Sequence, residues 1–184
     1  MVYTAEQATD AIADLDLNTL LPEEVEQEVK NIINQLDTTA LNTSSTNTVL
    51  YSEASVDDIV DNPNYRLIKN TEAYKFLNHD SLQDNEPLND ALEKAYGDRP
   101  DFDQWTSQAG KFIGGDDSIT PRIRGAWDTV SANFVQGAEG NVITKIGDNA
   151  SINSIFFQTE LESVGANPNI THIDGIEKTK LLIN

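Results

Sequence analysis

Apolar residues recur at helical spacing within the first forty positions, and this pattern predicts two amphipathic helices. The first helix follows a capping box that runs from Thr4 to Gln7, and the second begins at Pro22. The apolar positions of the first are Ala8, Ala11, Ile12 and Leu15. Those of the second are Val25, Val29, Ile32, Ile33 and Leu36. Each helix has one apolar face to bury, so we expect both to serve packing rather than chemistry.

Short apolar runs alternate with helical patterns along the rest of the chain. The predicted strands are 48–51 (TVLY), 65–68 (YRLI), 141–146 (NVITKI), 170–173 and 178–183 (KTKLLI). The predicted helices are 56–61, 71–77, 87–96, 102–113, one that starts at Thr120-Pro121, and 152–163 capped by Ser151. Strands separated by helices favour an α/β fold with a small, largely parallel sheet flanked by helices, behind an all-helical N-terminal segment.

A polar run at 37–48 (DTTALNTSSTNT) separates these two patterns. It consists mainly of Thr, Ser and Asn and has little to bury, which is typical of a linker. We therefore predict two parts: a helical N-terminal segment with its linker at 1–47, and an α/β domain at 48–184.

The composition narrows the classes of partner. The 184 residues carry 31 acidic and 12 basic side chains, a formal net charge of −19. Such a field repels phosphate backbones and anionic lipid, so we expect no nucleic-acid and no membrane partner. The chain has no cysteine, two histidines and no acidic spacing of the calcium-loop kind, so we expect no metal site. No apolar run is long enough for a membrane span and no signal pattern opens the chain, which indicates a soluble protein.

Three places in the sequence could carry chemistry. Glu160 follows Phe156 and Phe157 closely, and burial among them would make its charge costly; a surface glutamate on a helix is the alternative. Trp127 and Ser131 are four residues apart and share one helix edge, although a tryptophan there could equally be a core residue. Tyr51-Ser52 closes the first predicted strand, and ligands gather at the carboxyl ends of parallel strands.

Four segments together resemble the ADP-ribosyl cyclase family, most closely its cysteine-free bacterial relatives that occur as toxin domains of secreted proteins. The segments are Leu50-Tyr51-Ser52, Leu67-Ile68-Lys69-Asn70-Thr71, Trp127-x-x-x-Ser131-x-x-Phe134 and Ser154-x-Phe156-x-x-x-Glu160. The resemblance covers the chain from about Val49 onward, and the last two motifs are its more specific part.

The resemblance implies an NAD⁺ glycohydrolase or ADP-ribosyl cyclase with NAD⁺ as substrate and no cofactor or metal. By this likeness Glu160 is the catalytic carboxylate, which stabilises the oxocarbenium ion formed as nicotinamide departs. The substrate-binding residues carried over are Trp127 for nicotinamide, Ser131 for a phosphate, Phe156 for the pocket wall, and Tyr51, Ser52, Ser154 and Lys69. A toxin relative would be secreted or delivered, would act in a target-cell cytoplasm, and would have an immunity protein as its partner.

The chain departs from the family pattern at three positions. Tyr51 replaces a tryptophan, Lys69 replaces an acidic residue, and Glu53 stands where a basic residue is common. The product, linear or cyclic ADP-ribose, therefore stays open, and the pyrophosphate needs other cations: Arg122, Arg124 or Lys145. Two alternatives also stay open, namely an inactive relative that binds a nucleotide and an acidic inhibitor or decoy without enzyme activity.

Overall fold

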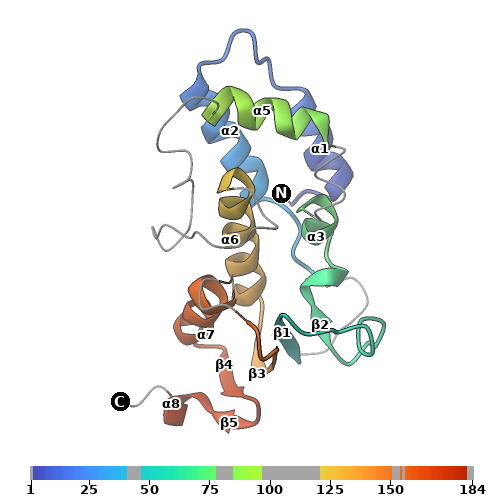
Figure 1. Cartoon of the computed structure of the whole chain (residues 1–184), viewed down its shortest axis with the longest axis vertical. Coiled ribbons are helices and arrows are strands. Elements are labelled where there is room, and N and C mark those ends of the chain that lie inside the picture. The colour runs from blue at the N-terminus through green and yellow to red at the C-terminus, as the bar shows by residue number, and fades with distance from the viewer. Residues whose placement is uncertain are drawn as a thin grey trace. The chain divides into compact units, whose positions relative to one another are not determined.

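The computed structural model describes residues 2–40, 47–77, 85–96, 121–150, 154 and 156–181 (Figure 1). The chain divides into two compact units, Met1–Asp37 with Glu72–Val130, and Thr38–Thr71 with Ser131–Asn184. Among the described residues, no helix combines the length and the apolar character that crossing a membrane requires. The division predicted from the sequence, between a helical segment at 1–47 and an α/β domain at 48–184, stays a prediction. The helix predicted at 102–113 lies outside the described residues.

The first unit is helical. It contains α1 (Ala5–Ala13), α2 (Pro22–Asn34), α3 (Glu72–Leu77), α5 (Glu86–Tyr96) and the part of α6 (Pro121–Gln136) that ends at Val130. Helices α1, α2, α3 and α5 pack on one another through their apolar faces. Thr4 Oγ1 accepts from Gln7 N at 3.1 Å, and Gln7 Oε1 accepts from Thr4 N at 3.1 Å. The capping box, the start of α2 at Pro22 and the buried stripe of α2 are therefore confirmed.

The second unit is built on a five-stranded sheet (Figure 1). Its strands are β1 (Thr48–Ser52), β2 (Arg66–Leu67), β3 (Gly140–Ile146), β4 (Ile170–Ile173) and β5 (Ile176–Glu177), in the order β2-β1-β3-β4-β5. The first four strands in this order are parallel, and β5 pairs antiparallel with β4. The α/β class with a largely parallel sheet is confirmed. We call the edge where the parallel strands end the carboxyl edge.

One side of this sheet, the loop face, is covered by the connection from β1 to β2. Side chains alternate along a strand, so Val49 and Tyr51 point to this face together with their neighbours on β2 and β3. Its core cluster consists of Val49, Val56 and Leu67, with Tyr51, Ile59, Val60, Tyr65 and Ile143 packed against it. Loop residues 56–65 thus provide the cover that a crossover helix provides in larger parallel sheets.

The other side, the helix face, is covered by the C-terminal part of α6. Arg66 lies with its guanidinium 3.9 Å from the centre of the Phe134 ring and donates to Thr48 Oγ1 at 3.3 Å. Burial lowers the pKa of Arg66 to about 10, which still leaves the group protonated at neutral pH. Because Thr48 points to this face, Leu50 and Ser52 do so as well.

The connection from β3 to β4 also lies on the helix face. It consists of a π-helical turn, η3 (Phe156–Glu160), and α7 (Leu161–Ala166). Asn167, directly after α7, donates from Nδ2 to the carbonyls of Val135 at 2.9 Å and Ala138 at 3.0 Å, at the end of α6. The rule that parallel crossovers are right-handed places η3 and α7 on the same side as α6.

Three predicted elements differ from the structure in kind or in length. Residues 56–61 form successive turns instead of a helix, because i+3 bonds such as Ile59 N to Val56 O (3.0 Å) are not extended into a full helical ladder before the turn at Asn62. The second strand is only Arg66–Leu67, after which Ile68–Asn70 forms a 3₁₀ turn, η1. The helix predicted at 152–163 is the π turn followed by α7, and its predicted cap Ser151 lies outside the described residues.

The strand predicted at 178–183 is wrong. The chain reverses at Asp174 (φ 51°) and Gly175 (φ 80°), and the two residues of β5 complete a hairpin with β4. Lys178 then turns inward, where its Nζ donates to the carbonyls of Val164 (3.1 Å) and Asn167, and Lys178–Leu181 forms the short helix α8. The hydrogen bonds of Lys178 to these two carbonyls thus direct the chain away from the sheet, although the alternating pattern of residues 178–183 suits a strand.

We predict that Lys178→Ala lowers the free energy of unfolding by about 1–3 kcal/mol, because two buried hydrogen bonds from a charged donor are lost. Each carbonyl keeps a backbone donor, Asn167 N for Val164 and Ile170 N for Asn167. Lys180→Ala is the matched control: that lysine is exposed and pairs with Glu177 three residues away, so its loss costs under about 0.5 kcal/mol. Urea unfolding of both variants measures the difference. Equal stabilities would contradict the anchoring role of Lys178.

Gly147 lies where β1 and β3 leave the sheet together. Its N–H donates to Ser52 O at 2.8 Å and extends the ladder between the two strands. A Cβ on Gly147 would stand 1.9 Å from the carbonyl oxygen of Glu53, a residue that itself has φ 50°. Only glycine permits this close approach of two backbones.

Gly147→Ala is therefore expected to destabilise the protein by about 1–3 kcal/mol through forced separation of the strand ends. Gly165→Ala serves as the control, because a Cβ on Gly165 in α7 meets nothing within 4 Å and alanine favours a helix by up to about 1 kcal/mol. Thermal or urea unfolding should move the two variants in opposite directions; a neutral Gly147→Ala would refute the packing argument.

Candidate functional site

Glu160 is a buried acid at the carboxyl edge of the second unit. It is the last residue of η3 and the N-cap of α7, and 7% of its surface is exposed. Phe156 and Thr159 on the same turn are buried as well, whereas Glu162 is exposed. The sequence allowed either a buried glutamate or a surface glutamate on a helix, and the structure shows that Glu160 is buried. A carboxylate is costly to remove from water, so a buried one is a candidate for chemistry.

Buried charge is rare in the part of the chain that the structure describes. Three charged side chains there are buried: Asp128, Glu160 and Lys178. Lys178 is bonded to the end of α7, and Asp128 belongs to the first unit. Glu160 is therefore the buried acid of the second unit within the described residues.

The turn that carries Glu160 is π-helical, a rare geometry that recurs at functional sites. Ser154 precedes the turn, and its Oγ accepts from Phe157 N at 3.4 Å. The rings of Phe156 and Phe157 meet edge to face, with centroids 4.9 Å apart. The turn packs against β1. The hydroxyl of Ser154, predicted to bind substrate, thus has a local role in shaping the turn.

Ser131 is buried on α6, on the same face of the sheet as Glu160. Helices α6 and α7 both run toward the amino edge, where Asn167 joins their ends. Ser131 precedes the end of α6 by five residues, and Glu160 precedes Asn167 by seven. At a rise of about 1.5 Å per residue both lie roughly 7–10 Å from that joint, at a similar height. By this estimate Ser131 and Glu160 stand at a similar height on the helix face.

Tyr51 and Ser52, which are adjacent in sequence, point to opposite faces of the sheet. Ser52 shares the helix face with Ser131 and Glu160, while Tyr51 packs on the cluster of the loop face. The two residues were expected in one substrate site. The alternation of β1 assigns them different surroundings, and they approach a common ligand only at the carboxyl edge.

Trp127 belongs to the first unit. Its indole is half-buried and meets the ring of Tyr74 on α3 edge to face, with centroids 5.6 Å apart. Tyr74 is a contact that the sequence analysis did not anticipate, although its place on the helix predicted at 71–77 could have marked it. Trp127 thus has an aromatic partner within its own unit, and its proposed role in stacking on nicotinamide is untested.

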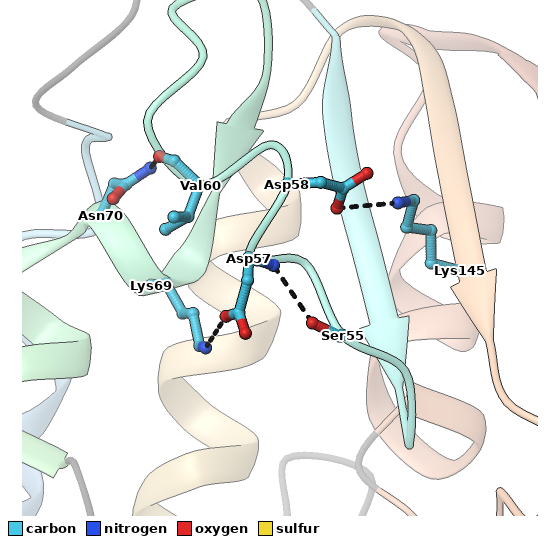
Figure 2. Close-up of polar contacts among 7 residues, drawn as sticks. All are labelled: Ser55, Asp57, Asp58, Val60, Lys69, Asn70 and Lys145. Atoms are coloured by element: carbon cyan, nitrogen blue, oxygen red, sulfur yellow. Dashed lines mark hydrogen bonds and ion pairs between the residues drawn. The ribbon is translucent and has the colours of Figure 1, made fainter.

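The lysines predicted at or near the site lie beside the loop between β1 and β2. Lys69 Nζ is 3.9 Å from Asp57 Oδ1, and Lys145 Nζ is 3.5 Å from Asp58 Oδ1 (Figure 2). Lys145 is the register partner of Tyr51, so its side chain also starts from the loop face. The side chains of Arg122 and Arg124 lie outside the described residues.

The structure thus separates the predicted site into two groups. Glu160, Phe156, Ser131 and Ser52 belong to the helix face, and Tyr51, Lys69 and Lys145 belong to the loop face. Within the described ranges, no group of three or more His, Asp or Glu side chains is arranged to hold a metal ion. Comparisons of the chain with protein-family models, curated proteins and solved structures found no match.

Proposed function

We propose that the second unit is a hydrolase that cleaves the bond between nicotinamide and ribose in NAD⁺, with Glu160 as the catalytic carboxylate. The observation that carries this proposal is the burial of Glu160 on a π turn that packs against β1. A fixed negative charge in a water-poor environment acts most strongly where positive charge develops in the transition state.

The proposed reaction needs no group beyond the chain, the substrate and water. Nicotinamide leaves with the electron pair of the glycosidic bond, and the ribose carbon becomes positively charged. The Glu160 carboxylate stabilises this oxocarbenium ion and binds the ribose hydroxyls. Water then attacks the same carbon and loses its proton, which gives ADP-ribose; attack by the adenine ring gives a cyclic product instead. Ser131 would bind a phosphate, and Phe156 would exclude water beside the reacting carbon.

The wider setting of this activity follows from the same resemblance and is proposed with it. An NAD⁺-cleaving domain of this kind would act as a delivered effector that depletes NAD⁺ in a target-cell cytoplasm. Its cognate partner would be an immunity protein that covers the site. The residues carried over for substrate binding are Trp127, Tyr51, Ser52, Ser154 and Lys69.

A nucleotide-binding protein without catalysis is the second candidate. Tyr51 packs on the loop face, away from Glu160, and Lys69 stands next to Asp57 where the family has an acid. These two observations favour a site that retains binding groups without the arrangement that cleavage needs.

Nicotinamide release from NAD⁺ distinguishes the two candidates. We expect Glu160→Gln to reduce the rate by about 100-fold or more, because the amide keeps the shape of the side chain and removes its charge. Glu162→Gln is the control, since that exposed residue two positions on should leave the rate within about twofold. Thermal melting checks that both variants fold. Negligible release by the wild type, equal to that of Glu160→Gln, would refute the enzyme and leave the binding protein.

A further inference from the structure

The loop between β1 and β2 carries two neighbouring acids that engage two different lysines. We call residues 53–64 the acidic strap. In Figure 2 Asp57 reaches toward Lys69, which follows β2, and Asp58 reaches toward Lys145 on β3. The N–H of Asp57 donates to Ser55 Oγ at 3.3 Å, which orients the strap locally. The two lysines thus stand on either side of β1, at the strands that flank it.

The backbone of the strap is held independently of these ion pairs. Val56 is buried in the core cluster of the loop face, and Ile59 and Val60 pack against it. Asn70 Nδ2 donates to Val60 O at 2.7 Å (Figure 2). Rotation of the Asp57 and Asp58 side chains could therefore release both lysines while the strap remains in place.

The two ion pairs are weak. They measure 3.9 and 3.5 Å, the Asp57 and Asp58 side chains are 85% and 70% exposed, and the lysine side chains are about one-third exposed at 32% and 33%. Exposed pairs of this kind contribute little to stability, because water and salt screen the two charges. A phosphate group carries more negative charge than a carboxylate and binds a lysine more strongly. The carboxylates are accordingly replaceable by such a group.

The other cationic side chains of the second unit are engaged elsewhere, which leaves the same two lysines as candidates for binding a phosphate. The unit has five: Arg66, Lys69, Lys145, Lys178 and Lys180. Arg66 and Lys178 donate to carbonyl groups and are largely buried, and Lys180 pairs with Glu177 beyond the last strand. Lys69 and Lys145 remain, beside the carboxyl ends of β2 and β3, where ligands of parallel sheets bind.

We propose that Lys69 and Lys145 form a binding site for the phosphate groups of a diphosphate-bearing small molecule, and that Asp57 and Asp58 are built-in competitors for it. The aspartates keep the lysines neutralised in a chain of net charge −19, and the incoming diphosphate displaces one or both of them. Tyr51 lies on the strand between the two lysines, so a ligand with a planar ring could also contact its aromatic side chain. Lys69 is also among the residues proposed above for NAD⁺ binding, so the inference rests on that proposal where the diphosphate is that of NAD⁺; neither lysine takes part in the bond cleavage at Glu160.

The test is calorimetric titration of the full chain with inorganic pyrophosphate at about 10–20 mM salt, where the Debye length is about 20–30 Å, and again at 0.15 M. Asp57→Asn with Asp58→Asn should lower Kd by about 3- to 10-fold, because the internal competitors lose their charge. Lys69→Ala with Lys145→Ala should abolish measurable binding. No NAD⁺ is used, so the result does not depend on activity at Glu160.

The matched control is Asp61→Asn with Asp148→Asn, which removes the same charge from two exposed acids that no ion pair joins to a lysine in the described structure. An equal gain in both double variants would show that only net charge matters and would overturn the proposal. Absence of pyrophosphate binding in every variant at low salt would overturn it too. A parallel titration with ADP identifies the ligand class: tighter binding than pyrophosphate indicates a nucleotide, and equal binding indicates the diphosphate alone.

Discussion

The hydrogen bonds of Asn167 hold the helices and strands of the second unit together at the amino edge of the sheet. The buried side-chain amide of this residue donates to the carbonyls of Val135 and Ala138 at the end of α6, where the helical ladder supplies no further donors. Its side-chain oxygen accepts from Asn169 N at 2.9 Å and closes the turn into β4, and its own carbonyl accepts from Lys178. One residue thus joins α6, α7, β4 and α8. Because Glu160 is the N-cap of α7, this joint also anchors the helix that carries that carboxylate.

The polar and charged side chains of the predicted site lie on two different faces of the parallel sheet. The buried acid and the serines lie on the helix face, where α6, η3 and α7 exclude water. The lysines with accessible charge lie on the loop face, where the acidic strap covers the sheet. The strand order produces this division. The chain moves from β1 to β2 in one direction along the sheet and from β3 to β4 in the other, so right-handed connections place the two crossovers on opposite faces. At the carboxyl edge, Gly147 approaches the backbone of Glu53 closely where β1 and β3 end.

Sequence patterns predicted elements well wherever a local signal coincided with a burial requirement. The capping box at Thr4, the proline at the start of α2 and the apolar run of β1 all appear as expected. The prediction failed at 178–183, where the alternating pattern was correct for a strand but the ammonium group of Lys178 found two buried carbonyls. It also missed the π turn, because over the five residues Phe156–Glu160 an α-helix and a π turn fit the same pattern of apolar and polar positions.

Glu160 and Ser131 were singled out by the family resemblance, since local spacing left a surface glutamate and a core helix face as alternatives. The structure shows that both residues are buried, and their roles in a site stay predictions. Local spacing was enough for the fold class, since strands alternating with helices admit few topologies. Long-range pairing decided the rest. Only the register of β1 with β3 shows that Tyr51 and Lys145 are neighbours, and only the packed loop shows that Asp57 and Asp58 reach the two lysines. Such contacts join residues up to 87 positions apart, and no local pattern encodes them.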